Sequence, residues 1–384
     1  MRIYDILVVD DSIFMRKIIS DLISEDPQFR VVATAKNGKE AVELIKKLKP
    51  NAVTMDIEMP EMNGLDALKT IMSEHPTPII MLSSLTQEGA RETIIALERG
   101  AVDFVGKPSG SISLDLHKVK TALIEKLHIA VKTNVNKFNA KLAPPNPLRF
   151  NKPAGESKAS IPSAPVAQPA PKPYKQEGNH SSGKLMNPPA SQVQQLAAIG
   201  TSTGGPRALH QVISNIPGDF AAPVVIVQHM PPNFTKSLAQ RLDSVSELTV
   251  VEAEDGMILH NGTAYVAPGG FHMMVARNGP GMYKIHLCKE DPRNGHRPSV
   301  DVLFESLLPL KELRRHIVLM TGMGSDGAKG MLALKQAGAV TTIAESEETC
   351  IVYGMPRAAV ELQCVSHILP QQEIAHMLSK AVLT

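Results

Sequence analysis

The sequence is poor in features that mark several large protein classes. Its three cysteines, Cys288, Cys350 and Cys364, contain no CxxC pair, which argues against a disulfide framework or a zinc site and fits a reducing compartment. The formal net charge is only +2, so neither a nucleic-acid-binding stripe nor an acidic tail is indicated. No apolar run approaches the roughly 18 residues of a membrane span, and the N-terminus lacks the apolar segment of a signal peptide. We therefore expect a cytosolic protein without membrane insertion and without nucleic-acid binding.

The chain nevertheless has enough length and apolar content for more than one domain. It contains 384 residues, of which 43% are hydrophobic. One segment, Ala143–Ala190, holds 11 of the 29 prolines and only scattered apolar residues. Such a segment cannot bury enough surface to offset its ordering entropy, which predicts a flexible Pro-rich linker; a proline-rich peptide ligand is the less common alternative. The predicted domains are therefore 1–142 and 191–384, joined by the linker 143–190.

The first 142 residues alternate short apolar runs with amphipathic helical patterns. Five strands alternating with helices predict a flavodoxin-like, doubly wound parallel sheet, which binds ligands at the carboxyl ends of its strands. The predicted strands are Ile6–Val9, Val31–Ala35, Ala52–Asp56, Ile79–Leu82 and Val102–Val105, and the predicted helices are Ile13–Ser24, Lys39–Leu48, Leu65–Ser73, Glu88–Arg99 and Leu116–Leu142.

The C-terminal part repeats this pattern less regularly. Buried strands are predicted at Leu196–Ile199, Pro223–Val227, Ile317–Met320 and Val340–Ile343. The stretch Thr263–Leu287 alternates around two glycine-rich turns, at 268–270 and 278–281, and this pattern indicates antiparallel hairpins. The prediction is a three-layer α/β domain with a mostly parallel sheet and an antiparallel hairpin insertion.

Charged and hydroxyl side chains end successive strands of the first domain. Asp10 and Asp11 follow the first strand, Asp56 ends the third, Ser83 follows the fourth, and Lys107 follows the fifth. The carboxylates would repel one another at this common edge unless a cation intervened, and Mg²⁺ prefers such oxygen ligands. Mg²⁺ and the lysine together would neutralise an incoming phosphoryl group. Helix capping is an alternative for Asp11 alone.

A serine with a candidate base and a candidate acid marks the second domain. Ser202 lies in a G-x-S-x-G turn between a predicted strand and a predicted helix, a spacing typical of nucleophiles but also of simple N-caps and phosphate cradles. His229 follows the next strand, and the ends of neighbouring strands lie about 5 Å apart. Asp326 follows a later strand. Their order, Ser, His, Asp, predicts triad chemistry on a fold other than the α/β-hydrolase fold.

One rival interpretation concerns the loop that carries the aspartate. Gly322, Gly324 and Gly327 spell G-x-G-x-x-G, and Glu345 follows the next strand where a ribose ligand of a dinucleotide-binding domain is expected. Against this interpretation, Asp326 would place a negative charge beside the pyrophosphate, where the helix dipole favours anions. We therefore favour a hydrolase.

The N-terminal part resembles the response-regulator receiver family over its whole length, through D-D, D, S and K-P on successive strand ends. The resemblance implies that Asp56 is the phosphoacceptor and that Asp10, Asp11 and Asp56 bind Mg²⁺. It implies that Lys107 contacts the phosphate and that a histidine kinase donates it.

Two further positions match the switch residues of that family. Ser83 stands at the switch hydroxyl and Phe104 at the switch aromatic. Asp66 and Asp103 lie outside the pattern, and we expect both to be solvated.

The C-terminal part resembles the chemotaxis protein-glutamate methylesterase family. The resemblance implies Ser202 as the nucleophile, His229 as the base and Asp326 as its partner. Thr203, next to the serine, and Met323, by its place in its loop, are candidate oxyanion-hole amides. The segments that carry it, in order, are GTSTGGP, QHMPPNFT, EAEDG, YVAPGG, HRPSVDVLF and TGMGSDGAKGM.

The receiver–linker–esterase order implies an enzyme that demethylates glutamate methyl esters on chemoreceptors, also deamidates receptor glutamines, and is activated by phosphorylation. The expected protein is a monomer, cytoplasmic and recruited to receptor arrays, with Mg²⁺ in the receiver and no cofactor for ester hydrolysis. The alternative is a receiver-controlled scaffold that binds methylated receptors without turnover.

Overall fold

The computed structural model describes residues 2–107, 113–133, 135 and 192–383. The predicted linker, 143–190, lies outside these residues, together with both domain boundaries predicted beside it. The two sheets below belong to one compact unit. Within the described ranges, no helix is long and apolar enough to cross a membrane.

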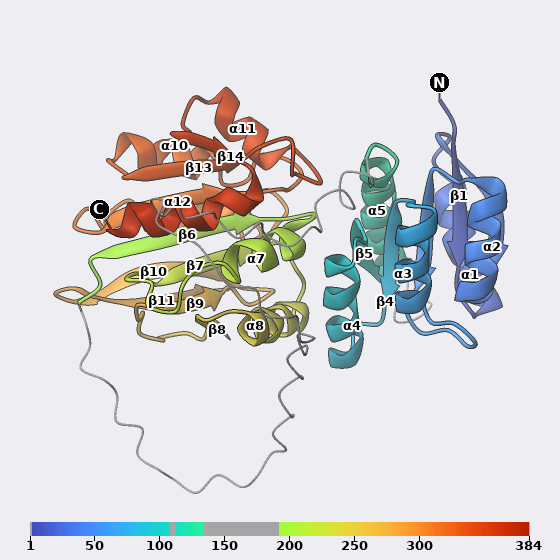
Figure 1. Cartoon of the computed structure of the whole chain (residues 1–384), viewed down its shortest axis with the longest axis horizontal. Coiled ribbons are helices and arrows are strands. Elements are labelled where there is room, and N and C mark those ends of the chain that lie inside the picture. Colours follow the sequence, from blue (N-terminus) through green and yellow to red (C-terminus); the bar gives the residue numbers. More distant parts are fainter. Residues whose placement is uncertain (1, 108–112, 134, 136–191, 384) are drawn as a thin grey trace, which may run out of the picture. The chain divides into compact units, whose positions relative to one another are not determined.

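The N-terminal domain is built on a five-stranded parallel sheet of order β2-β1-β3-β4-β5, shown with its helices in Figure 1. A helix follows every strand, and the strand order reverses between β1 and β3, which is the switch point of a doubly wound sheet. The predicted flavodoxin-like fold is confirmed. Its strands are β1 (Tyr4–Val9), β2 (Phe29–Ala35), β3 (Ala52–Asp56), β4 (Ile79–Ser83) and β5 (Asp103–Gly106), and its helices are α1 (Ile13–Ser24), α2 (Gly38–Leu48), α3 (Gly64–Glu74), α4 (Gln87–Glu98) and α5 (Ser113–Ala130).

Apolar side chains cover both faces of this sheet. On one face, Ile19 of α1 and Leu123 of α5 share a cluster with Ile6 of β1. On the other face, Leu68 of α3 shares a cluster with Leu7 of β1. Because both faces are buried, the strands are apolar runs rather than alternating ones, and burying each large aliphatic side chain contributes roughly 1.5–3 kcal/mol.

Two details of this domain differ from the sequence predictions. Helix α1 is capped by Ser12, whose Oγ accepts the Met15 N–H at 3.3 Å, so Asp11 is not the cap and its carboxylate needs another explanation.

Helix α5 ends at Ala130, where the chain continues in a turn, because the amides of Lys132 and Thr133 donate to carbonyls three residues earlier. The predicted extension of this helix beyond residue 130 is therefore wrong for residues 131–133. Residues 136–142 lie outside the residues that the structure describes.

The C-terminal domain contains a seven-stranded parallel sheet of order β14-β13-β12-β6-β7-β9-β8. Its strands are β6 (Gln195–Thr201), β7 (Val224–Gln228), β8 (Thr249–Glu252), β9 (Thr263–Val266), β12 (Arg314–Leu319), β13 (Thr341–Glu345) and β14 (His367–Leu369), and its helices are α7 (Gly205–Ile213), α8 (Phe234–Val245), α9 (Val300–Ser306), α10 (Ala328–Gln336), α11 (Met355–Glu361) and α12 (Gln371–Leu383).

Three layers form this domain. Leu209 of α7, Leu238 of α8 and Leu378 of α12 belong to the cluster on one face of the sheet. Phe304 of α9 and Met331 of α10 belong to the cluster on the other face, together with side chains of the antiparallel hairpin β10–β11. The predicted three-layer α/β class with a hairpin insertion is therefore confirmed.

The hairpin insertion is smaller than predicted. Only β10 (His272–Gly279) and β11 (Met282–Cys288) pair antiparallel. The segment Thr263–Val266 instead forms β9, which lies parallel between β7 and β8. Its last three residues are all buried, so it is covered on both faces, as an interior strand of a parallel sheet is. The hairpin predicted around 268–270 is therefore wrong.

The strand order brings three loops together at one edge of the sheet. β6 lies between β12 and β7, with Gly200 beside Leu319 and Thr201 beside Gln228. The loops that follow these three strands carry Ser202, His229 and Asp326. The carboxyl ends of parallel strands share one edge, and ligands bind there near the switch point.

Candidate active site

Ser202 stands on a tight turn immediately after β6. Gly204 has a φ of 81°, the left-handed region that favours glycine, and it is the N-cap of α7. A Cβ at Gly205 would clash with the side chains of Gln228 and Thr201. The turn therefore needs glycine at both positions, and it leaves the serine nearly buried, with 9% of its surface exposed.

Neighbouring strands hold this turn in place. The Ser202 N–H donates to the Thr321 carbonyl at 3.0 Å, and Gln228 Nε2 donates to the Ser202 carbonyl at 2.9 Å. Gln228 Oε1 in turn accepts from the Thr201 hydroxyl at 2.5 Å. Sequence reasoning missed Gln228; its position as the last residue of β7, directly before the candidate base, was the available signal.

His229 and Asp326 form the ion pair of the site. His229 Nε2 lies 2.8 Å from an Asp326 carboxylate oxygen, and both side chains are almost fully buried. An ionised carboxylate only accepts, so Nε2 carries the hydrogen and Nδ1 keeps its lone pair. Nδ1 is buried and has no hydrogen-bond partner in the described part of the chain. Nδ1 is therefore the nitrogen that can accept a proton from Ser202. Ser202 and His229 line the same pocket, although no hydrogen bond joins their side chains.

Asp326 is held by the start of α9 as well as by the histidine. Its carboxylate accepts from the Ser299 hydroxyl at 2.9 Å, the Val300 N–H at 2.7 Å and the Asp301 N–H at 3.1 Å. Burial alone would raise the pKa of Asp326, but the hydrogen bonds from His229 and these amides hold it below its usual range. Asp326 is therefore ionised at neutral pH. Ser299 also caps α9, through the Val302 N–H.

A second histidine lies against the first. The rings of His296 and His229 stack with centroids 3.8 Å apart and an interplanar angle of 9°. Burial, together with the neighbouring His229, lowers the pKa of His296 to about 4, so this ring is neutral at pH 7. Its flat contact restricts rotation of the His229 ring. The sequence gives no sign of this contact, because His296 does not lie at the end of a strand.

Two backbone amides are suitable for an oxyanion. Thr203 follows Ser202 directly, and Met323 lies in the loop after β12; both line the pocket. In the described ranges, the N–H group of neither residue donates a hydrogen bond. Two free donors beside a candidate nucleophile are what a developing oxyanion requires.

The acidic residues of the first domain also come together. Ligand atoms of Asp10, Asp11 and Asp56 lie within 4.8 Å of one another, with Asp11 exposed and the other two buried. Lys107 Nζ lies 2.6 Å from Asp56 and 3.1 Å from Asp10. Burial raises the pKa of Asp56 to about 6 in spite of the lysine. Three carboxylates this close provide the oxygen ligands that suit Mg²⁺.

Comparisons with known proteins agree on the family. The CheB methylesterase model matches residues 197–378, and the response regulator receiver domain model matches residues 6–117. A protein-glutamate methylesterase/protein-glutamine glutaminase of Geobacillus kaustophilus is 50% identical over 98% of this chain and 97% of its own length. The chain belongs to the CheB methylesterase family.

Two further proteins are similar to this chain. The protein of the same name from Halalkalibacterium halodurans is 47% identical over 96% of each chain. The crystal structure of the Thermotoga maritima CheB methylesterase catalytic domain is 46% identical, covers 48% of this chain and 97% of that chain, and has a TM-score of 0.47.

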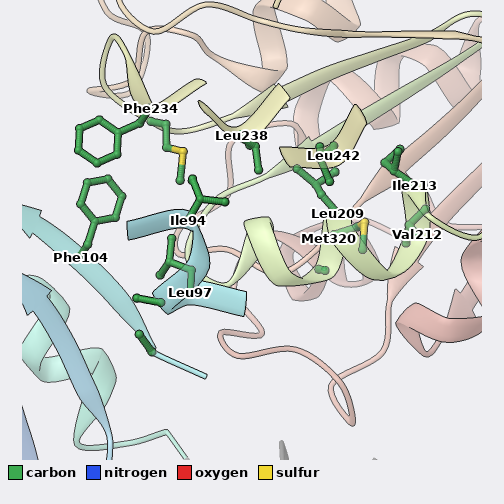
Figure 2. Packing of buried hydrophobic residues seen from close by; sticks show 14 of the residues in the cluster. Ile94, Leu97, Phe104, Leu209, Val212, Ile213, Phe234, Leu238, Leu242 and Met320 are labelled. Atoms are coloured by element: carbon green, nitrogen blue, oxygen red, sulfur yellow. The ribbon is translucent and has the colours of Figure 1, made fainter. Parts of the chain in front are cut away.

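The two residues predicted as receiver switch residues, Ser83 and Phe104, are both buried. Ser83 Oγ accepts from the Thr93 hydroxyl at 2.7 Å and lies 3.2 Å from the Gly89 carbonyl, which ties it to α4. Phe104 stacks on Phe234 of the methylesterase domain, with centroids 4.5 Å apart and an angle of 16°. Figure 2 shows these two rings facing each other, with Ile94, Leu97 and other cluster members beside them.

Polar contacts join the same elements of the two domains. The Thr203 hydroxyl donates to Asp103 at 2.6 Å, and Asp103 also accepts from Lys126 at 2.8 Å. Arg241 pairs with both carboxylate oxygens of Glu98 at 2.9 and 3.0 Å. The expectation that Asp103 is solvated is wrong: it is buried because the Thr203 turn covers it.

Proposed function

We propose that the chain is a phosphorylation-controlled serine esterase that removes methyl groups from glutamate γ-methyl esters of chemoreceptors and deamidates receptor glutamines. The names of the full-length relatives carry both activities. The observation that supports the chemistry best is the His229–Asp326 bond, which leaves a buried, unpartnered Nδ1 in the pocket of Ser202. This arrangement favours turnover over a binding scaffold.

The proposed mechanism is acyl transfer through the serine. His229 Nδ1 takes the proton from Ser202 Oγ while Oγ attacks the ester carbonyl carbon, and the imidazolium is stabilised by Asp326. The amides of Thr203 and Met323 bind the oxyanion. The imidazolium returns its proton to the departing methoxide, giving methanol and an acyl-enzyme. Water, deprotonated by the same histidine, then attacks the acyl carbon, and the C–Oγ bond breaks as the histidine returns this proton to Ser202 Oγ, which releases the glutamate. With a glutamine substrate, ammonia leaves in place of methanol.

The alternative of a dinucleotide-binding site at the loop 322–327 is not supported by the surroundings of Asp326 and Glu345. Asp326 is fully engaged by His229 and the start of α9. Glu345, the candidate ribose ligand, has no exposed surface. A nucleotide would have to displace hydrogen bonds at both positions.

Phosphorylation is proposed to occur at Asp56. Asp10, Asp11 and Asp56 would hold Mg²⁺, which supplies charge neutralisation for the incoming phosphoryl group. Lys107, already paired with Asp56, would contact the phosphate. The donor would be a chemotaxis histidine kinase, and the protein would act as a cytoplasmic monomer recruited to receptor arrays.

Control is proposed to act through the contacts between β5, α4 and the Ser202 edge. Thr203, a candidate oxyanion residue, is bonded to Asp103, and Phe104 covers Phe234. Leu97, Asp103 and Phe104 of the receiver line the same pocket as Ser202 and His229, so the receiver occupies space beside the nucleophile. Phosphate on Asp56 would draw Ser83 toward it, release Phe104 and loosen the contact.

The test is methanol release from a methylated receptor fragment with Mg²⁺ and a small-molecule phosphodonor. We expect phosphodonor to raise the rate of the full-length protein and to leave Asp56→Asn at the basal rate. A chain without residues 1–190 should be faster than the unphosphorylated full-length protein. Equal rates for all three would rule out gating by the receiver, and no methanol from any of them would rule out the esterase.

A further inference from the structure

Glu345 is a buried acid that the proposed mechanism does not use. It is the last residue of β13 and has no exposed surface. One carboxylate oxygen accepts the Thr321 N–H at 2.9 Å, and the other accepts the Thr349 hydroxyl at 2.8 Å. The acid is therefore placed between two loops at the edge of the sheet that carries Ser202.

Thr321 connects this acid to the nucleophile turn. Its carbonyl accepts the Ser202 N–H at 3.0 Å, and its hydroxyl donates to the Thr203 carbonyl at 2.9 Å. The same hydroxyl accepts the Val352 N–H at 3.0 Å. One residue thus bonds to Ser202 and Thr203 on one side and to Glu345 on the other.

The loop with the second oxyanion amide starts at the same point. Gly322 follows Thr321, and its N–H donates to the Val352 carbonyl at 3.0 Å. A Cβ at Gly322 would lie 2.7 Å from the Cβ of Ser202 and would clash with Met355. Thr321 is bonded to the Ser202 turn and also begins the loop that carries Met323. A shift of Thr321 would therefore change the distance between the Met323 amide and Ser202.

A carboxyl group at this position is costly, which argues for a specific role. Burial raises the pKa of Glu345 to about 7, and hydrogen bonds from Thr321 and Thr349 and the charge of Arg207 act against this shift. The Cys350 thiol donates to the main-chain carbonyl of Glu345 and is a further titratable group in contact with this residue. A residue chosen only to fill space would be apolar.

We infer that Glu345 is a positioning residue of the esterase, which acts through Thr321 to hold Ser202 and the Met323 loop in register. The inference rests on the proposed function. It assigns no contact with substrate to Glu345. Its effect should therefore appear in kcat rather than in KM.

The test compares full-length variants in methanol release and in the rate at which a fluorophosphonate labels Ser202. Glu345→Ala leaves the buried Thr321 N–H without an acceptor. We expect it to lower kcat and the labelling rate about tenfold or more, with KM within threefold. Glu345→Gln keeps an acceptor for Thr321 and should stay within threefold of wild type. Thr349→Val, a matched control on the other carboxylate oxygen, should also stay within threefold.

A second variant covers the case in which Glu345→Ala does not fold. Thr321→Val keeps the backbone bonds but removes the hydroxyl that holds Thr203, and we expect a similar loss in kcat and labelling. Wild-type kcat in Thr321→Val, or in a folded Glu345→Ala, would overturn the inference. Absence of methanol from the wild type, with normal labelling, would instead count against the proposed substrate.

Discussion

The two sheets of this chain use the same edge for different chemistry. In the receiver domain, Asp10, Asp56 and Lys107 lie directly at strand ends, and Lys107 forms ion pairs with both carboxylates. In the methylesterase domain, Ser202, His229 and Asp326 also follow strands, but each is held by hydrogen bonds from a different loop or helix start.

The receiver site and the esterase site obtain their reactivity in different ways. The receiver pocket concentrates like charges, and burial raises the pKa of Asp56 to about 6, so the site is suited to a metal ion and a phosphoryl group. The esterase pocket instead fixes the direction of each donor and acceptor, which lowers the pKa of Asp326 and sets the tautomer of His229. Charge density matters in the first site and geometry in the second.

If the esterase site depends on geometry, removing one triad member should remove most of the activity. Ser202→Ala and His229→Ala should each lower methanol release by roughly 10⁴-fold or more, with little further loss when combined, because the residues act as a unit. The measurement is kcat on methylated receptor fragment. Near-normal turnover by Ser202→Ala would exclude this serine as the nucleophile.

Asp326 tests the fixed tautomer separately. Asp326→Asn offers only one acceptor oxygen where the carboxylate accepts four hydrogen bonds, and its amide would favour the wrong histidine tautomer. We expect kcat to fall by roughly 10³-fold, less than for the serine or the histidine. Ser299→Ala, which removes one neutral partner of the same carboxylate, is the control and should lose far less. Equal effects in the two variants would contradict the tautomer argument.

The free-energy cost of ionising the buried Glu345 can be measured from the pH dependence of protein stability. Its pKa of about 7 in the folded protein exceeds the ordinary value of 4.5. As pH rises, the unfolded chain therefore loses this proton before the folded protein does. The contribution of Glu345 to the unfolding free energy is fully present below pH 4.5 and is lost as pH rises to about 7. At 1.36 kcal/mol per unit, the loss is at most about 3 kcal/mol.

Glu345→Gln has no proton to lose and serves as the reference. We expect the unfolding free energy of wild type, relative to that of Glu345→Gln, to decrease across this pH window in urea titrations. The difference should be flat above pH 8. A difference that is constant from pH 4.5 to 7 would mean that Glu345 keeps its ordinary pKa.

The smallest expected effect concerns the contact between the domains. Glu98→Ala removes the partner of Arg241, a partly exposed pair that is worth little more than about 1 kcal/mol. We expect basal methanol release to rise about two- to fivefold without phosphodonor. Glu43→Ala on α2 is the control and should leave the rate unchanged. A rate for Glu98→Ala that equals the control rate would show that this pair does not restrain the enzyme.

Much of the fold followed from the sequence, for a physical reason. Strands buried on both faces are apolar runs, and the helices between them are amphipathic, so β1 to β5 and their order could be predicted. The edge of a parallel sheet then placed Asp10, Asp56 and Lys107 together without further information. That reasoning failed for β9, because alternation next to a glycine turn resembles a hairpin whether or not the partner strand is adjacent.

The roles around the esterase pocket were harder to predict. Ser299 and His296 reach the site from the segment before α9, and no strand end marks them. Asp103 was expected in solvent because it lies outside the receiver pattern, and its partner, Thr203, is 100 residues away in the sequence. Contacts of this range depend on tertiary packing, and the printed sequence contains no local signal for them.

The orientation of the His229 ring has a consequence for the kind of product the enzyme can expel. Because Nε2 is committed to Asp326, the proton travels through Nδ1, which is bonded to the ring carbon that carries Cβ. A group that receives this proton must approach the edge of the ring that lies nearer the main chain of residue 229. Methanol and ammonia are small enough to fit there. From this orientation of the imidazole ring we expect small leaving groups to be released fastest.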